Sequence, residues 1–155
     1  MSARYAQTTD VSSDRSRTEI ERTLTRYGAT SFTYGWEAGR AAIAFVMAGR
    51  QIRCVLPLPD REAREFTHHS RGARTASAAE AAYEQAVRQR WRALALMVKA
   101  KLEGVASGIV TFETEFLPHT VLPSGHTVAE DVLPAVAIAY ETGRVAPLLI
   151  EGGNR

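Results

Sequence analysis

Three short stretches of alternating polarity, set between two helical patterns, constrain the fold of this 155-residue chain most strongly. Within residues 31–57, apolar and polar side chains alternate with a period of two, the pattern of β-strands with one buried face. Short connections at residues 37–39 and 48–50 separate the stretches. Pro57 and Pro59 end the last one, because proline lacks the N–H that a sheet ladder needs. The pattern predicts a three-stranded antiparallel meander, which needs a helix against one face to be stable.

The alternation assigns one face of each predicted strand to the core, because side chains two residues apart point to the same side. The inward-facing sets are Phe32, Tyr34 and Trp36 in the first stretch, Ile43, Phe45 and Met47 in the second, and Ile52, Cys54 and Leu56 in the third. Two interpretations remain open for the three aromatic residues of the first stretch. They belong to the core, or they provide a platform on which nucleic-acid bases stack.

Helical patterns flank the predicted sheet on both sides. Apolar residues recur at i, i+4 and i+7 from Ile20, and a Ser-x-x-Glu capping box at Ser16 marks the expected start of the first helix. A longer apolar stripe covers roughly residues 78–106 and follows a second capping box that begins at Ser77. At about 1.5 Å per residue this helix is on the order of 40 Å long, enough to lie across the whole sheet.

The remaining segments predict an arm, a loop and a C-terminal helix. Residues 1–13 are polar and lack periodicity, so we expect a flexible N-terminal arm. Residues 60–76 are long and polar enough to predict a mobile loop. A third capping box, at residues 127–130, starts a helix that runs to about Thr142, and Pro134 is expected to kink or split it.

Together these segments predict a single α+β domain over residues 14–150, followed by a tail at residues 151–155. Its expected order is helix, three-stranded antiparallel meander, long helix, and a C-terminal hairpin and helical extension. In the extension, residues 109–117 fit either a helix or a strand, and we prefer a short helix. Residues 120–127 predict a small hairpin around a Pro-Ser-Gly turn.

Several classes of protein are not indicated by the sequence. No apolar run reaches the roughly 18–20 residues that span a bilayer, and the N-terminus lacks the apolar stretch of a signal peptide. Cys54 is the one cysteine, so no internal disulfide can form, and we expect a cytoplasmic protein. The chain contains no phosphate loop, dinucleotide fingerprint or nucleophile elbow, so we expect no cofactor and no enzymatic activity.

The histidines and the cysteine do not form a recognisable chemical site. His68 and His69 are adjacent, while His119 and His126 flank the predicted hairpin, and this spacing matches no zinc pattern. Cys54 occupies an inward strand position, which favours a core residue over a nucleophile. We therefore assign no catalytic residue and no metal ligand.

Charge is divided unevenly along the chain. Residues 1–110 contain 17 Lys and Arg against 11 Asp and Glu, a net of +6, whereas residues 111–155 contain 2 against 6, a net of −4. A basic surface favours a polyanionic partner, so nucleic acid is the first partner expected. Arginine outnumbers lysine 17 to 2, for which phosphate recognition and a GC-rich genome are both open explanations.

Two groups of cations provide candidate contacts to phosphate. In the predicted meander, two arginines stand at strand ends and a third lies opposite the inward-facing residues. On the long helix, three cations fall within about 40° of one another and form a ridge on the order of 16 Å long, for which a solvated helix face is the alternative. The candidate nucleic-acid-binding residues are Arg40, Arg50, Arg53, Arg88, Arg92 and Lys99.

Several short runs resemble a known group of proteins. The runs are Arg26-Tyr27-Gly28-Ala29, Tyr34-Gly35, Gly49-Arg50, Leu56-Pro57-Leu58-Pro59-Asp60, Arg90-Trp91-Arg92-Ala93-Leu94 and Val98-Lys99-Ala100-Lys101-Leu102-Glu103. In these runs the chain resembles small uncharacterised proteins encoded by bacteriophages, prophages and bacterial genomes, and the likeness covers most of residues 14–150. The resemblance implies no established activity. It implies a phage or mobile-element setting, in which small basic proteins serve replication, recombination or the contest with host defences.

These observations favour a non-enzymatic protein that binds nucleic acid through its backbone, single-stranded DNA in particular. The alternative is a protein-interaction module, such as a phage factor that binds a host or defence protein, or a homo-oligomeric structural protein. The alternative draws on the long helix, because its apolar stripe extends beyond what three strands can cover and the uncovered end would need a partner.

Overall fold

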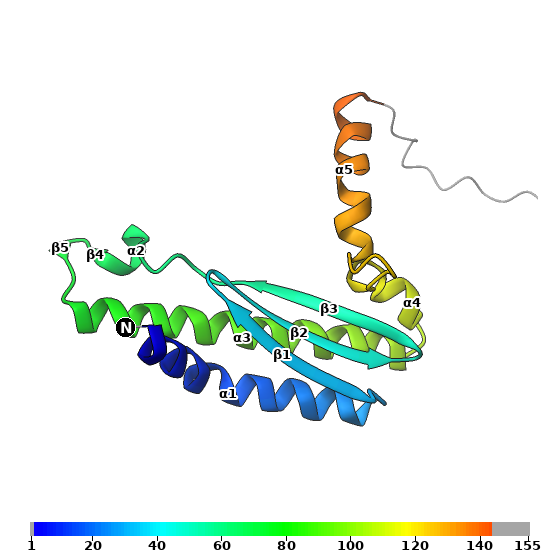
Figure 1. Cartoon of the computed structure of the whole chain (residues 1–155), viewed down its shortest axis with the longest axis horizontal. Helices are drawn as coiled ribbons and strands as arrows, with labels where there is room; N and C mark the ends of the chain where they lie inside the picture. The colour runs from blue at the N-terminus through cyan, green and yellow to red at the C-terminus, as the bar shows by residue number, and fades with distance from the viewer. Residues whose placement is uncertain (1, 144–155) are drawn as a thin grey trace, which may run out of the picture.

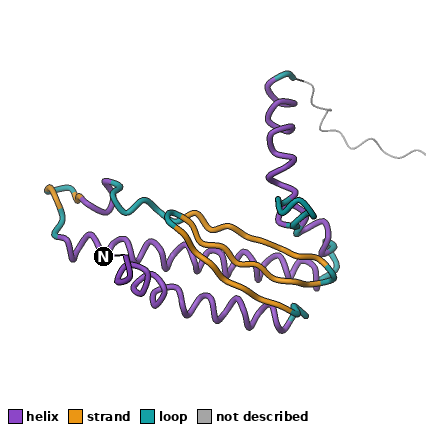
Figure 2. Tube along the Cα trace, viewed as in Figure 1, coloured by secondary structure: helices purple, strands orange, loops and turns teal. Residues whose placement is uncertain are grey.

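The computed structural model of the chain describes the backbone of residues 2–143 and the side chains of residues 13–143. Its elements are α1 (Ser2–Arg26), β1 (Ser31–Glu37), β2 (Arg40–Met47), β3 (Arg50–Pro57), α2 (Arg64–Thr67), β4 (His68–His69), β5 (Gly72–Ala73), α3 (Ala76–Ala106), α4 (Phe112–Glu115), a 3₁₀ turn η1 (Leu117–His119) and α5 (Val128–Glu141). The fold is α+β, as predicted. One layer is the three-stranded sheet, the other holds α1 and α3, and α5 projects away from both (Figures 1 and 2).

The sheet is the predicted antiparallel meander, with strand order β1-β2-β3. Tight turns close both hairpins, with Glu37 paired to Arg40 and Met47 paired to Arg50. In the second turn, Ala48 and Gly49 both have positive φ, 50° and 70°, which is the backbone of a type I′ turn. This turn follows the right-handed twist of the strands, although Ala48 carries a Cβ where glycine or asparagine fits better.

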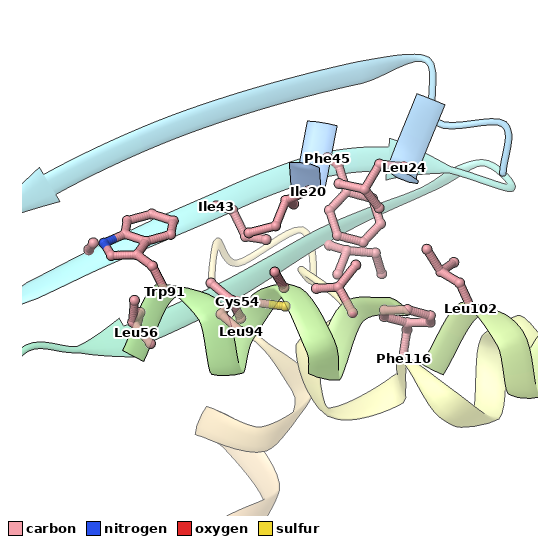
Figure 3. Packing of buried hydrophobic residues seen from close by; sticks show 14 of the residues in the cluster. Ile20, Leu24, Ile43, Phe45, Cys54, Leu56, Trp91, Leu94, Leu102 and Phe116 are labelled. Carbon is pink, nitrogen blue, oxygen red and sulfur yellow. The ribbon is translucent and has the colours of Figure 1, made fainter. Parts of the chain in front are cut away.

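The core lies between the sheet and α3. The inward faces predicted for β2 and β3 are confirmed, because Ile43, Phe45 and Cys54 are among the residues that are almost fully buried there (Figure 3). Trp91 of α3 is 1% exposed, and its ring centroid lies 5.5 Å from that of Tyr34. The aromatic residues of β1 therefore share the helix-facing side, and only Trp36, at the end of the strand, is largely exposed.

The two long helices run in the same direction (Figure 1). Three antiparallel strands separate the two helices in the sequence. The strands bring the chain back to the end of the molecule at which α1 begins, and α3 therefore starts at that end and runs parallel to α1 (Figure 1). Tyr27, at the end of α1, donates a hydrogen bond of 2.5 Å to Glu103 near the end of α3. Halfway along α1, Arg17 stacks on the Tyr34 ring, 4.1 Å from its centroid, next to Trp91.

Both long helices begin earlier than the sequence indicated. α1 starts at Ser2, so residues 2–13 are helical where a flexible arm was expected, and the pattern at Ser16 lies inside the helix. The segment contains no glycine or proline that would interrupt a helix. The N-cap of α3 is Thr75, whose hydroxyl accepts from the Ala78 N–H at 3.2 Å, rather than Ser77.

Residues 60–76 are not an irregular loop throughout. They contain α2 and the β4–β5 hairpin, and Phe66 is buried against Tyr83 of α3 with edge-to-face rings. Arg61 stacks over the Tyr83 ring and pairs with Glu80, which the sequence had assigned to a capping box. One apolar residue, Phe66, therefore anchors a segment whose composition is otherwise that of a loop.

The C-terminal extension follows the prediction closely. Residues 112–115 form a short helix, and the Leu122 N–H donates to His126 O within the expected hairpin. α5 begins at the predicted capping box, but Pro134 does not split it. Residues 144–150 of the predicted domain and the predicted tail at residues 151–155 lie outside the described residues.

Replacing Trp91 with alanine tests the central role of the contact between the sheet and α3. We expect Trp91→Ala to lower the free energy of unfolding by about 3–5 kcal/mol, because it leaves a cavity between the two layers. Urea unfolding followed by circular dichroism measures the change. Leu96→Ala is the matched control on the same helix, since Leu96 is 60% exposed and its truncation should cost less than about 0.5 kcal/mol. Equal losses in the two variants would contradict this account of the core.

Candidate functional site

The structure does not bring the six predicted cations onto one surface. Arg53 lies between Ile52 and Cys54 on β3, and both of these face the helices, so Arg53 belongs to the opposite, open face of the sheet. Arg88, Arg92 and Lys99 are exposed on α3, in the helical layer. The sheet itself therefore stands between Arg53 and this basic ridge.

Arg40 and Arg50 lie at opposite ends of the sheet. The register pairs Arg40 with Pro57 at one end of the β2–β3 ladder and Met47 with Arg50 at the other. Arg40 is exposed and forms an ion pair with Glu37 across the first turn. These two arginines are thus too far apart to act together on one phosphate group.

Arg53 has a structural role that the sequence did not indicate. Its guanidinium donates to the carbonyl oxygen of Gly125 at 2.9 Å and to Glu130 Oε2 at 3.2 Å. The same carboxylate accepts the Thr127 N–H at 2.7 Å and completes the capping box of α5. Arg53, Gly125, Thr127 and Glu130 therefore form a polar cluster, here called the α5 stem, that ties the first turn of α5 to β3.

The charge of Glu130 is stabilised by this cluster. The pKa of its carboxyl lies below the ordinary value of 4.5, chiefly because the Thr127 N–H donates to it and also because the Arg53 guanidinium is close. Next to it, His126 Nδ1 lies 2.9 Å from Asp131 Oδ1. The α5 stem thus gathers charge and hydrogen bonds at the start of a helix whose remainder is apolar.

The body of α5 exposes an unusual amount of apolar surface for a helix that is capped at both ends. Five of its six large apolar side chains have exposed fractions between 41% and 67%, Val128 is half-buried, and none of its residues is buried. Four of them form one stripe, since at about 100° per residue they fall within roughly 100° of the helix circumference. The α5 stripe consists of Val132, Leu133, Val136 and Tyr140, and Ile138 lies on the other side.

A hollow of about 360 Å³ lies at the open face of the sheet. Small or apolar residues from all three strands line it, together with the Arg53–Glu130 pair of the α5 stem. The residues are Gly35, Trp36, Glu37, Arg40, Ala41, Ala42, Arg53, Val55 and Glu130. The predicted arginines Arg40 and Arg53 thus meet in one hollow, where each is paired with a glutamate.

A second, basic depression runs between α1 and α3 with a volume of about 840 Å³. Lys99 is the member of the predicted ridge that lines it, beside three arginines of α1 that were not among the candidate residues. The charged lining residues are Asp14, Arg15, Glu19, Arg22, Arg26 and Lys99. In the described part of the chain, no carboxylate forms an ion pair with Arg22, Arg26 or Lys99.

The titratable residues outside these clusters do not converge. Burial raises the pKa of the Cys54 thiol to about 11, so the thiolate that a nucleophile needs is scarce at neutral pH. Burial also lowers the pKa of His119, and the nearby Lys101 adds to this effect. Among residues 13–143, no three His, Cys, Asp or Glu side chains lie close enough to hold a metal ion.

No family model, curated protein or solved structure matches the chain. None of the helices within residues 2–143 combines the length and the apolar character that crossing a membrane requires.

The α5 stem should weaken at acidic pH. Because the pKa of Glu130 is lowered by folding, its contribution is complete above the ordinary value of 4.5 and is lost as the pH falls through the lower value of the folded state. The protection of the α5 amides from hydrogen exchange, measured by NMR and corrected for the intrinsic pH dependence of amide exchange, should therefore decrease as the pH falls over this acidic range. Glu130→Gln keeps an acceptor for the Thr127 N–H but cannot titrate, so its exchange should lack this added acidic step. An identical acid response in both proteins would refute the role of Glu130.

Proposed function

We propose that the chain is a protein-interaction module that binds its partner through α5. The observation that carries the proposal is the α5 stripe, in which four large apolar side chains lie exposed on one side of a projecting helix. Exposed apolar surface that is contiguous and rimmed by charge is typical of protein interaction sites. Glu130, Asp131 and Glu141 provide such a rim at the two ends of α5.

The energetics of α5 support a partner. Complete burial of one large apolar side chain is worth about 1.5–3 kcal/mol, so covering the α5 stripe offers several times that amount before the costs of association. A 14-residue helix without tertiary packing is only marginally stable in water. A surface that covers α5 would therefore stabilise the helix as well as bind it.

The anchoring of α5 also supports this function. The α5 stem fixes the first turn through Arg53, while the stripe begins after that turn, at Val132, and continues to Tyr140. A helix held only at its base presents its sides to another molecule, and it loses less conformational freedom on binding than an unfolded segment would. Amphipathic helices that dock into apolar grooves bind through anchor residues spaced at i, i+3, i+4 and i+7. Leu133, Val136 and Tyr140 provide the i, i+3 and i+7 positions of this pattern.

As part of this proposal, we place the protein in the cytoplasm. Its cysteine is free and buried within the core, which suits a reducing compartment. In the phage or mobile-element setting that the sequence resemblance implies, the partner is a host or defence protein or a further copy of the chain. The last possibility is developed below.

Charging the α5 stripe tests the proposed function. We expect Leu133→Glu combined with Val136→Glu to abolish capture of protein partners by the immobilised chain, because each glutamate would be buried without a counter-charge. The measurement is affinity capture from bacterial extract, quantified by mass spectrometry. Leu96→Glu is the control, because it charges an exposed leucine of α3 that lies outside the stripe. Circular dichroism verifies that all the variants fold. Equal captured sets for the α5 variant and the wild type would count against the proposal.

A second candidate function, binding of single-stranded nucleic acid, is favoured by the depression between α1 and α3. Arg22, Arg26 and Lys99 line it without ion pairs in the described part of the chain, so their charge is available to phosphate. Asp14 and Glu19 line the same depression and oppose a polyanion. This opposition makes nucleic acid the weaker of the two candidates.

Salt-dependent binding separates this candidate from the first. If the depression holds phosphates, Arg22→Ala and Lys99→Ala should each lower the salt slope of single-stranded DNA binding by about 0.7. Fluorescence anisotropy of a labelled oligonucleotide, titrated at several salt concentrations, measures the slope. Arg40→Ala should leave it unchanged, since Arg40 is paired with Glu37 at the far end of the sheet. No binding at micromolar protein and low salt would exclude this function.

A further inference from the structure

We infer that the partner of α5 is a second copy of this chain, in a symmetric dimer where each α5 lies on the open face of the other protomer's sheet. The inference rests on the proposed function, because it assigns an occupant to the same helix. The open sheet face consists of the outward residues of the three strands. They are Ser31, Thr33, Gly35 and Glu37 of β1, Arg40, Ala42, Ala44 and Val46 of β2, and Gln51, Arg53, Val55 and Pro57 of β3.

The open sheet face has room for a helix. Within residues 2–143, the two long helices both lie on the inward side, and no helix lies across the open sheet face (Figure 1). Its central rungs carry small side chains, with Gly35 paired to Ala42 and Thr33 paired to Ala44. A Cβ placed on Gly35 would meet no atom within 4 Å, so the space above this rung is free. Small side chains of this kind let a helix approach the sheet closely.

The dimensions of the two surfaces match. α5 has 14 residues, which makes it about 21 Å long. β2 has eight residues, which makes the central strand about 26 Å long. One helix can therefore lie along the open sheet face without extending beyond it, and the hollow lined by Ala42 and Val55 accepts a large side chain at one end.

Within one chain, the α5 stem keeps α5 off its own sheet. Arg53 holds Gly125 and Glu130 beside β3, and the Val121 N–H bonds to the Gln51 carbonyl on the same strand. From this base α5 points away from the sheet (Figure 1). Because Glu130 turns toward Arg53, the α5 stripe, centred roughly 100° around the helix from it, is directed elsewhere. The helix and the open sheet face are thus available to a second molecule rather than to each other.

The area that each arrangement buries favours this dimer over simple pairing of two α5 helices. One side of a helix about 21 Å long and about 10 Å wide buries on the order of 400 Å² of accessible surface. Pairing the two helices alone buries only that amount on each protomer, below the roughly 800 Å² typical of a stable interface. Reciprocal docking buries one helix side and one sheet face on each protomer, about 800 Å², and closes the assembly with two-fold symmetry.

Charge does not oppose this contact. The charged residues of the open sheet face are Glu37, Arg40 and Arg53. Arg40 already pairs with Glu37, and Arg53 pairs with Glu130 of its own chain. The α5 stripe contains no charged residue. Docking therefore buries apolar and small polar groups without leaving an unpaired charge in the interface.

Oligomeric state provides the first test. Light scattering coupled to size-exclusion chromatography should give twice the chain mass for the wild type at concentrations of tens of micromolar. Val136→Glu on the helix and Ala44→Glu on the sheet should each give a monomer, whereas Leu96→Glu on α3 should remain a dimer. Circular dichroism verifies that each variant retains its helices. A wild-type monomer across this range, or a dimer that survives both changes, overturns the inference.

Disulfide trapping identifies the contacting surfaces. Chains with Ala44→Cys are mixed with chains that carry Val136→Cys and a size tag, and mild oxidation should join the two kinds of chain. The buried Cys54 has a raised pKa and should remain unlinked. Val136→Cys alone should form little disulfide if α5 docks on the sheet. Efficient linkage of Val136→Cys to itself would show helix pairing instead and would overturn the inference.

These experiments separate the inference from the proposed function. A monomeric wild type whose capture of another protein is lost in the α5 variant overturns the dimer but leaves the interaction function in place. If the wild type is a monomer and the α5 variant captures the same proteins, both the dimer and the proposed interaction function are overturned. An α5-dependent dimer that links Ala44→Cys to Val136→Cys supports both.

Discussion

Burial of the inward sheet face against α3 is the interaction on which the rest of the structure depends. A three-stranded meander has too little apolar surface to be stable alone, and Trp91, Phe45 and Cys54 provide the missing contact between the layers. α1 and α2 add to the same core through Leu24 and Phe66. Because all this packing lies on one side of the sheet, no helix of residues 2–143 covers the other side, which remains exposed in this part of the chain.

The α5 helix represents the opposite case, in which apolar residues are held away from the core. Polar contacts fix its first turn, and its apolar body begins beyond them. The sequence expectation placed the interaction surface among the cations of residues 1–110, whereas the proposed function places it on the apolar surface of residues 128–141. Arg53 illustrates the difference, since a residue expected to meet phosphate instead holds the helix that carries the most conspicuous exposed surface. Its partners, Gly125 and Glu130, lie more than seventy residues away in the sequence.

Much of the fold could be predicted from local patterns, because strand alternation, tight turns and capping boxes are encoded within a few residues. The faces of β2 and β3 and the start of α5 at Thr127 are confirmed examples. Contacts distant in sequence could not be predicted this way, so Glu80 was assigned to a cap although it pairs with Arg61. The sequence of α5 contains one sign of its exposed apolar surface, because its apolar residues occupy nearly every side of the helix. That pattern alone could not predict which of these residues are exposed, because their exposure depends on how the other elements pack.

The parallel course of α1 and α3 has an electrostatic consequence. Parallel helices align their dipoles, so the partial negative charges of both C-terminal ends gather at the end of the molecule where Tyr27 meets Glu103. α3 has no cation in its last turn, whereas α1 has Arg26 there, and Arg26 shares a depression with Lys99 of α3. Cations near helix C-termini are each worth roughly 0.3–1 kcal/mol. Part of the positive charge on this helical layer therefore compensates two aligned helices, a role that requires no ligand.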